Sequence, residues 1–289
     1  MKKILYSMLI FLLILLNFST VCADDVDNEV DFEDTIEVTA SNVSELPKTN
    51  SRRYIVYDRI SKSMIIGKNE DIKSAMASTT KIMTTIVILE KADLNETVTV
   101  SAKAGGTGGS RLGLKRGDKA SVRDLLYGLM LRSGNDAAVA LAEHVGGSVK
   151  EFAELMNEKA SELGLTNTHF VTPHGLDDAN HYTTALELAK LTDYAMNNET
   201  FSKIVGTKSI TIYINNQPRQ INNTNELLGV LNGVVGVKTG FTNNAGRCLV
   251  TETKRNNMDI ITIVLGADTK KDRTKDSVNL IEYTYSKYK

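Results

Sequence analysis

Three short motifs in this 289-residue chain combine a nucleophile, a base and groups that could bind a carboxylate. They are Ser78-x-x-Lys81, Ser133-Gly134-Asn135 and Lys238-Thr239-Gly240. Each motif is short enough to arise by chance, since Ser286-x-x-Lys289 repeats the first pattern and Ser277-Val278-Asn279 the second. The order, the spacing and the structural context of the three motifs therefore carry the functional interpretation.

Ser78 and Lys81 could be a nucleophile and its general base. Apolar spacing predicts a helix from Ser78 to about Leu94, and side chains at i and i+3 lie on the same face of a helix. The positive partial charge at a helix N-terminus stabilises a serine alkoxide and, like partial burial, favours a neutral lysine. A neutral lysine could accept the serine proton. The alternative is that Ser78 only caps the helix and that Lys81 is solvated.

Ser133-Gly134-Asn135 is expected in a tight turn between two helices, where a rigid support would project Ser133 and Asn135. The alternative is an ordinary turn, because Ser, Gly and Asn are common turn residues. Lys238-Thr239-Gly240 ends a predicted strand, in which small residues let another segment approach closely. Its lysine and its threonine hydroxyl could hold a carboxylate, unless this segment is simply an exposed strand edge.

The elements around the motifs fall into two regions. Alternating apolar residues predict strands near the start of the domain and after about residue 208, whereas the middle of the chain has helical spacing with capping residues. The predicted strands are 53–58, 63–68, 209–214, 234–240, 247–254 and 259–266, and helices are capped by Ser121, Ser148 and Thr184. A stripe of Val278, Ile281, Tyr285 and Tyr288 predicts a last helix. We expect an α/β fold in which an antiparallel sheet flanked by helices adjoins a mostly helical region.

The N-terminal part of the chain reads as targeting and linker sequence. Two lysines precede a short apolar run and small residues, so residues 1–23 are predicted to be a secretory signal peptide. Residues 24–50 are strongly acidic at their start and are predicted to be a flexible linker, which leaves 51–289 as the domain. We therefore expect a secreted protein that acts outside the membrane. The overall net charge of -1 suggests no nucleic-acid partner.

Taken together and in this order, the motifs resemble the active-site triplet of penicillin-recognising serine enzymes. Four flanking segments resemble the low-molecular-weight D-alanyl-D-alanine carboxypeptidases, which are penicillin-binding proteins and serine peptidases of the SxxK type. These segments are "ASTTKIMT" (77–84), "SGNDAA" (133–138), "TPHGLD" (172–177) and "GVKTGFT" (236–242). The resemblance covers roughly residues 50 to 289. It implies a β-lactamase/transpeptidase-like fold with the active site between the sheet and the helical region.

The resemblance also implies a role for each matching residue. Ser78 would attack the bond between the two terminal D-alanines of a peptidoglycan stem peptide, with Lys81 as general base and Ser133 relaying the proton to the leaving amine. The backbone N–H groups of Ser78 and Phe241 would form the oxyanion hole. The residues implied to bind the substrate are Asn135, Lys238, Thr239, Gly240, Phe241 and Thr242. No cofactor and no metal would be needed, and β-lactam antibiotics would acylate the serine.

Other readings remain open from the sequence. A zinc carboxypeptidase would use histidines, but His169, His174 and His181 do not have metalloprotease spacing and are expected to form hydrogen bonds in loops. A β-lactamase would need a deacylating glutamate, and none is identified. A transpeptidase and a non-catalytic wall-binding module are further possibilities. The glycine-rich segment 105–114 is expected to form a loop near the cleft, with Ser110 in a structural role.

Many relatives carry a further β-rich domain and a C-terminal amphipathic helix that holds them to the membrane. In this sequence the expected terminal helix of the catalytic fold is followed by no further segment, so no C-terminal membrane anchor is seen.

Overall fold

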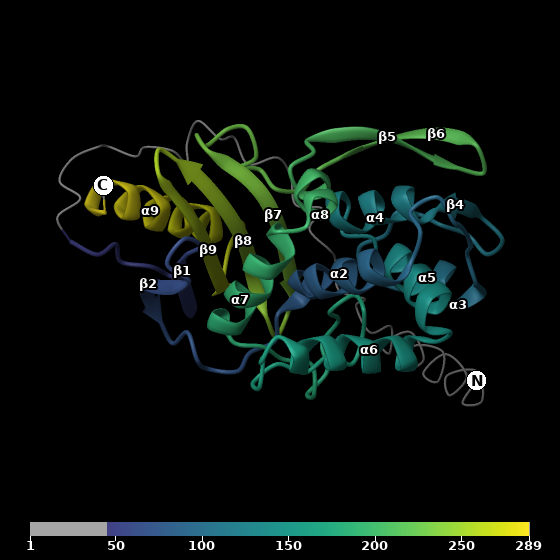
Figure 1. The fold of residues 1–289 in the computed structure, drawn as a ribbon, viewed down its shortest axis with the longest axis horizontal. Coiled ribbons are helices and arrows are strands. Elements are labelled where there is room, and N and C mark those ends of the chain that lie inside the picture. The colour runs from purple at the N-terminus through teal and green to yellow at the C-terminus, as the bar shows by residue number, and fades with distance from the viewer. Residues whose placement is uncertain (1–44, 289) are drawn as a thin grey trace, which may run out of the picture.

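The computed structural model describes residues 45–288, so the predicted signal peptide and most of the predicted linker lie outside the described residues. One region is built on a five-stranded antiparallel sheet with the strand order β2-β1-β9-β8-β7 (Figure 1). Its strands are β1 (Arg53–Asp58), β2 (Ser63–Lys68), β7 (Val234–Thr242), β8 (Gly246–Arg255) and β9 (Met258–Ala267). The main predicted strand pairs and the β8–β9 hairpin are confirmed.

Two helices cover opposite faces of this sheet. In β1, Tyr54 and Val56 pack in one apolar cluster with Leu280 of α9 (Lys270–Lys287), whereas Ile55 and Tyr57 belong to the main core. Successive side chains of a strand point to opposite faces, so α9 lies on one face of the sheet and α7 (Ala185–Met196), which also contributes to the main core, lies on the other.

The second region is mostly helical and lies beside strand β7 (Figure 1). Its central helix is α2, whose first eight residues, Lys81–Ile88, are all buried, so the helix crosses the core instead of lying on the surface. The surrounding elements are β3 (Thr97–Thr99), α3 (Ala102–Gly105), β4 (Lys119–Ser121), α4 (Val122–Leu131), α5 (Asn135–Gly146), α6 (Val149–Glu162), α8 (Glu199–Val205), β5 (Ser209–Ile214) and β6 (Gln217–Asn222).

The three predicted helix caps are confirmed. The hydroxyl groups of Ser121, Ser148 and Thr184 each accept a hydrogen bond from the backbone N–H three residues further on. Such a bond satisfies one of the free donors at the start of a helix. These caps fix where α4, α6 and α7 begin.

The strand predicted at 209–214 is confirmed as β5, which pairs with β6 outside the main sheet. Two sequence expectations differ from the structure. The helix expected from Ser78 begins as the 3-10 turn η2 (Ala77–Thr80), and α2 (Lys81–Lys91) follows it. Tyr288 lies beyond the end of α9 and is 43% exposed, so it does not continue the buried stripe.

A loop at residues 171–178 is seated against η2 at the base of the cleft. Gly175 has a φ of +89°, and a Cβ added there would lie 1.9 Å from the backbone oxygen of Ala77. The hydroxyl of Thr84 also donates to the backbone oxygen of Pro173 (2.7 Å). The loop can lie this close to the helix because residue 175 has no side chain.

A buried charge network joins α7 to the sheet. The guanidinium of Arg59 donates to Asp193 (3.0 Å) on α7, to Asp259 (3.0 Å) on β9 and to Glu252 on β8. Burial raises the pKa of the Glu252 carboxyl to about 7, and neighbouring Asp259 adds to this effect, whereas Arg59 opposes it. Glu252 is 0% exposed, so its carboxyl is shielded from solvent in the folded protein.

Glu252→Gln should flatten the pH dependence of stability on the acid side of neutrality. Because the pKa of the folded-state carboxyl lies above its ordinary value of 4.5, the folded protein binds this proton more tightly than the unfolded chain. The resulting stabilisation is complete below pH 4.5 and is lost as the pH rises toward about 7. Urea unfolding at several pH values should therefore show that the free energy of unfolding of the wild type falls relative to that of the variant. Glu158→Gln, at an exposed position on α6, is the control, and parallel curves for wild type and Glu252→Gln would contradict the prediction.

Gly175→Ala should destabilise the fold more than an alanine at a comparable but open glycine. At both Gly175 and Gly164 φ is positive, but nothing lies within 4 Å of a Cβ added at Gly164. Gly164→Ala should therefore cost only the backbone strain of about 1–2 kcal/mol, and Gly175→Ala should cost at least about 1 kcal/mol more because the loop must move. Urea unfolding of the two variants measures the difference, and equal losses would show that the loop is not held by this contact.

Candidate active site

The first motif forms a close pair at the base of the cleft. Ser78 is half-buried in η2, and Lys81, the first residue of α2, is fully buried. The amino nitrogen of Lys81 lies 2.8 Å from the hydroxyl oxygen of Ser78. The 3-10 turn keeps these two side chains on one face, as the i and i+3 spacing predicted. Ala77, directly before the serine, has a φ of +49°, so the chain enters this turn in an unusual conformation for a residue with a side chain.

Two further oxygens hold the amino group of Lys81. It donates to the side-chain oxygen of Asn135 (2.7 Å) and to the backbone oxygen of His174 (2.9 Å). The amide of Asn135 cannot be reversed, because its nitrogen donates to the backbone oxygen of Gly108 (2.8 Å). Both partners of Lys81 only accept hydrogen bonds, so they engage two of its N–H groups and leave its third position for Ser78.

The second motif turns the chain between α4 and α5. Ser133 has a φ of +57° and is 6% exposed, and its hydroxyl has no hydrogen-bond partner within residues 45–288. A left-handed serine costs free energy, and a buried hydroxyl without a partner costs more. Such costs are typical of positions that a ligand completes. The turn also sets Asn135, whose backbone N–H donates to the backbone oxygen of Ser110 (2.7 Å).

Asp136, next to the motif, anchors the glycine-rich loop on the same wall of the cleft. Its buried carboxylate accepts hydrogen bonds from the backbone N–H groups of Leu112, Gly113 and Leu114, all at 2.8–2.9 Å. These bonds hold the start of α5 and the segment 105–114 together. The expected loop near the cleft is confirmed.

The third motif forms the opposite wall of the cleft. Lys238 and Thr239 are buried on β7, and the amino group of Lys238 donates to the backbone oxygen of Thr239 (2.9 Å). The hydroxyl of Thr239 shares a hydrogen bond with that of Thr224 (2.9 Å). A Cβ added at Gly240 would lie 3.0 Å from the backbone nitrogen of Ser78, so the glycine permits the close approach that the sequence predicted.

The two residues after the third motif, Phe241 and Thr242, make contacts of a different kind. The ring of Phe241 lies 4.2 Å from the guanidinium carbon of Arg247 on the neighbouring strand. The hydroxyl of Thr242 donates to the carboxylate of Asp177 (2.6 Å) and accepts from the backbone N–H of Ala245 (3.1 Å). Thr242 thus ties β7 to the 171–178 loop, and its side chain is already engaged within the protein.

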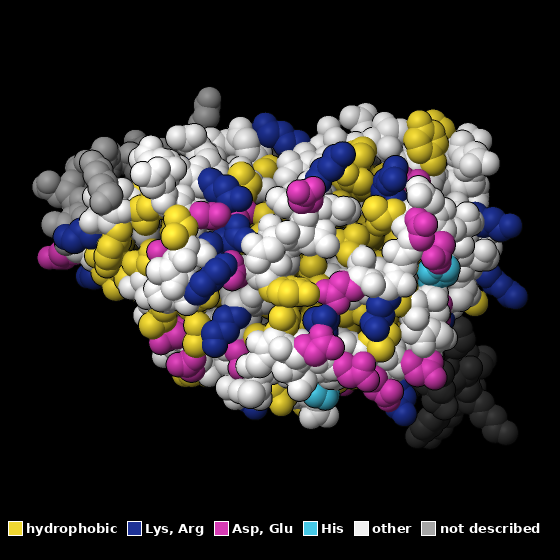
Figure 2. Space-filling model, in the orientation of Figure 1, with side chains coloured by type: hydrophobic (Ala, Val, Ile, Leu, Met, Phe, Trp, Pro, Cys, Tyr) yellow, Lys and Arg dark blue, Asp and Glu magenta, His cyan; other side chains and the backbone are white. Residues whose placement is uncertain are grey.

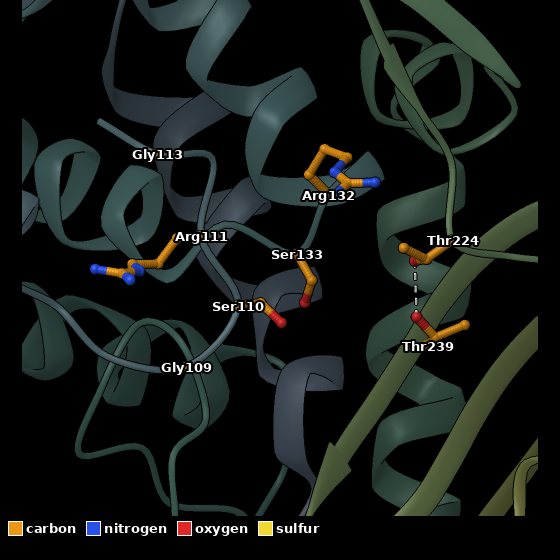
Figure 3. Close-up of a pocket in the computed structure, with 8 residues that line it drawn as sticks. All are labelled: Gly109, Ser110, Arg111, Gly113, Arg132, Ser133, Thr224 and Thr239. Atoms are coloured by element: carbon orange, nitrogen blue, oxygen red, sulfur yellow. Dashed lines mark hydrogen bonds between the residues drawn. The ribbon is translucent and has the colours of Figure 1, made fainter. Parts of the chain in front are cut away.

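A cavity of about 380 Å³ lies between the two walls. The hydroxyl groups of Ser110 and Ser133 come from one wall and those of Thr224 and Thr239 from the other, with the Arg132 side chain beside them (Figure 3). Ser110, expected to be structural, both fixes Asn135 through its backbone oxygen and lines the cavity. The cavity offers hydroxyl donors and positive charge, which suit a small anionic group such as a carboxylate.

The three histidines of the middle segment act as hydrogen-bonding residues, as expected. The ring of His181 accepts from the backbone N–H of Val171 (3.0 Å) and contacts the hydroxyl of Thr80 (2.8 Å), and the ring of His169 contacts a backbone oxygen. Burial lowers the pKa of His181 to about 4 and that of His174 to about 3, with Lys81 adding to the effect at His174. In residues 45–288 no group of three potential metal-ligating side chains comes together.

Several residues of the site were not identified from the sequence. They are Asp136, Arg132, Thr224 and the backbone oxygen of His174. Asp136 and His174 lie within the quoted segments 133–138 and 172–177. Their residue types do not show that the Asp136 carboxylate binds backbone N–H groups or that the backbone oxygen of His174 binds Lys81. Arg132 and Thr224 reach the cavity only through tertiary packing, so no local signal marks them.

None of the helices described in residues 45–288 is long and apolar enough to cross a membrane.

Comparisons with known proteins agree with this geometry. The model of the family Peptidase_S11, described as D-alanyl-D-alanine carboxypeptidase, matches residues 39–269. DacF, a D-alanyl-D-alanine carboxypeptidase of Bacillus subtilis, is 37% identical over 240 residues, which cover 81% of this chain and 62% of the relative. DacC of Escherichia coli is 38% identical over 270 residues, covering 85% and 64%. This chain therefore spans less than two thirds of the length of these relatives.

Solved structures show the same fold. The Streptomyces K15 DD-transpeptidase has a TM-score of 0.79 and 34% identity, and the match covers 84% of this chain and 99% of that one. The D-alanyl-D-alanine carboxypeptidase DacD of Francisella tularensis has a TM-score of 0.78 and 30% identity, covering 84% and 72%. The expected β-lactamase/transpeptidase-like fold is confirmed. By its sequence, its fold and the three motifs that meet in its cleft, the chain belongs to the D-alanyl-D-alanine carboxypeptidase family.

Proposed function

We propose that this protein is a serine-type D-alanyl-D-alanine carboxypeptidase that removes the terminal D-alanine from peptidoglycan stem pentapeptides through an acyl-enzyme. The observation that carries the proposal is the position of the Lys81 amino group, 2.8 Å from the hydroxyl of Ser78 and 2.7 Å from the amide oxygen of Asn135. This arrangement suits a base beside a nucleophile. The same serine would be acylated by β-lactam antibiotics.

In the first step Lys81 takes the proton of Ser78 as the serine oxygen attacks the carbonyl carbon of the penultimate D-alanine. Burial disfavours an ammonium group, and a neutral amine has two N–H groups and one lone pair. The two N–H groups donate to Asn135 and His174, so the lone pair faces Ser78. General-base catalysis of this kind contributes about 10²–10⁴ in rate.

The tetrahedral intermediate then collapses by breaking the peptide bond. Its oxyanion is stabilised by the backbone N–H groups of Ser78 and Phe241, and the close approach of Gly240 to Ser78 supports this role. Ser133, whose hydroxyl is buried without a partner in the described chain, passes the proton from Lys81 to the departing amine. The terminal D-alanine leaves with that proton, and the acyl group stays on Ser78.

The carboxylate of the terminal D-alanine occupies the cavity between the two walls. Lys238 and Thr239 bind this carboxylate. The side-chain amide of Asn135 forms a hydrogen bond with the substrate amide, and Gly240 leaves room for the backbone of the substrate. Thr242 contributes indirectly, because its contact with Asp177 holds the end of β7 in place. Water then attacks the carbonyl carbon of the acyl-enzyme. This step releases the shortened peptide and returns a proton to the oxygen of Ser78.

The proposed place of action is outside the membrane, after export directed by residues 1–23 and with residues 24–50 as a linker to the domain 51–289. Peptidoglycan lies there, so stem peptides and β-lactams would meet the enzyme without crossing the membrane. No cofactor takes part in the proposed reaction, and nucleic acid is not among the proposed partners.

Transpeptidation is a second candidate, because a neighbour that matches along almost its whole length is a DD-transpeptidase. The acyl-enzyme is common to both reactions, and only the acceptor differs. Adding glycine as an amine acceptor to a pentapeptide reaction separates them. A product that stays overwhelmingly the tetrapeptide supports hydrolysis, whereas a peptide ending in glycine supports transfer. Rapid turnover of nitrocefin, as opposed to a single stoichiometric burst, would instead indicate a β-lactamase.

Ser78→Ala should abolish both D-alanine release and labelling by penicillin. Peptide mass spectrometry of the wild-type adduct should locate one penicilloyl group on Ser78, because the buried amine of Lys81 lies 2.8 Å from its hydroxyl. Ser286→Ala removes the serine of the other Ser-x-x-Lys pattern and should behave like the wild type. An adduct on another residue, or D-alanine release by Ser78→Ala, would exclude the proposed nucleophile.

Lys81→Met should slow acylation by about 10²–10⁴-fold, since methionine fills a similar volume but accepts no proton. Stopped-flow measurement of the acylation rate with penicillin, on protein shown by circular dichroism to be folded, gives the value. Lys91→Met at the exposed end of α2 is the matched control and should acylate at the wild-type rate. If the two variants acylate equally fast, Lys81 is not the base.

A further inference from the structure

A second cavity lies at the other end of α4 from the catalytic cleft. Its volume is about 630 Å³, and its lining comes mainly from the paired strands β3 and β4, the β5–β6 hairpin and the start of α4. Helix α4 follows Ser121, which lines this cavity, and ends just before Arg132, which lines the catalytic one. Ten helical residues span about 15 Å, so the two cavities lie roughly that far apart.

The second cavity is built on a fixed frame. Asn215, in the turn of the β5–β6 hairpin, donates from its backbone N–H to the backbone oxygen of Lys119 on β4 (2.8 Å). Its side-chain oxygen accepts from the backbone N–H of Lys119, and its side-chain nitrogen donates to Asp118, both at 2.8 Å. These three hydrogen bonds, all made by Asn215, hold the β5–β6 hairpin to the start of β4. The cavity is therefore present before any ligand arrives, as is typical of binding sites.

The lining combines one exposed aromatic ring with neutral and oppositely charged polar groups. Tyr213 alternates with buried Ile212 and Ile214 on β5, so its ring points outward and is 53% exposed. Around it lie hydroxyl, amide, amino and carboxylate side chains, namely Thr97, Lys119, Ser121, Asp124 and Asn216. The charges of Lys119 and Asp124 cancel, so the lining favours neither an anionic nor a cationic ligand. Lys, Arg, Asp and Glu side chains are likewise interspersed over the face in Figure 2.

We propose that this cavity binds a sugar ring of the peptidoglycan glycan, an N-acetylated hexosamine. A hexose has an apolar C–H face that can lie on an aromatic ring and a rim of hydroxyl groups that need both donors and acceptors. Tyr213 supplies the ring, Lys119 supplies donors, and Asp124 and Asn216 supply acceptors. The identity of the ligand rests on the proposed function, because peptidoglycan is the polymer that brings sugars to the catalytic cleft.

The distance between the two cavities lets a glycan bound at the second cavity deliver its stem peptide to the catalytic cleft. An extended peptide of five residues spans up to about 17 Å, so stem peptides on a glycan held at Tyr213 can reach the cleft about 15 Å away. Holding the glycan converts peptide binding into an intramolecular step with a raised effective concentration. The benefit appears only with substrates that carry sugar, as a lower KM, and not with free peptides.

The test uses a peptide-free probe, the tetrasaccharide of N-acetylglucosamine, with the whole protein in isothermal titration calorimetry. The wild type should bind it saturably, Tyr213→Ala should bind about tenfold more weakly, and Tyr213→Phe should bind like the wild type because the ring remains. Tyr288→Ala removes another exposed tyrosine, 43% exposed, far from the cavity lining, and should have no effect. Tyr213→Ala should keep the wild-type rate of pentapeptide hydrolysis and lose only the KM advantage of glycan-linked stem peptide.

The outcomes separate this inference from the proposed function. No saturable binding of the tetrasaccharide by the wild type, or equal binding by Tyr213→Ala, overturns the saccharide site. So does binding of a sugar-free stem peptide, but not of the tetrasaccharide, at the residues of the cavity, which would make it a peptide groove. Failure of the proposed function would appear as absent pentapeptide hydrolysis in the wild type, whereas the binding measurement needs no catalysis.

Discussion

The structure depends on one buried amino group. Lys81 is fully enclosed at the start of α2, and its nitrogen contacts oxygens from Ser78, Asn135 and the backbone of His174. These three come from η2, from the first residue of α5 and from a distant loop. A buried amine must have polar partners, and partners brought from three segments can meet only when those segments are fixed. The need to provide hydrogen-bond partners for the buried amino group of Lys81 therefore determines how the segments at the base of the cleft are arranged.

Each supporting element fixes one of these partners. Gly175 lets the 171–178 loop lie against η2, which places the His174 oxygen. Asp136 binds three backbone N–H groups of the glycine-rich loop, and the backbone oxygens of Gly108 and Ser110 in the same loop orient Asn135. The cleft is thus assembled in the free protein, and a substrate meets groups that are already aligned. Pre-alignment of this kind lowers the reorganisation that catalysis would otherwise require.

Much of the fold followed from local pattern, and the site followed from motif order. Capping residues such as Ser121 located helix starts, and alternating apolar residues located the strands of the main sheet, because these signals act within a few residues. The 209–214 strand was found but not its partner, since pairing depends on which face is buried by distant helices. Arg132 and Thr224 carried no local signal at all. Side chains that matter through backbone contacts, such as Asp136, show their role only when the chain is folded.

Strand β7 forms the outer edge of the five-stranded sheet in the described part of the chain, and it is also a wall of the cleft. A strand at a sheet edge presents main-chain groups to whatever lies beside it. An extended ligand can therefore extend the sheet by one more strand, with recognition by peptide groups common to every amino acid. Exposed edges commonly invite aggregation, and here the helical region stands beside the edge and limits access to it. The helical region thus both protects the edge of β7 from pairing with other chains and limits which ligands can reach that edge.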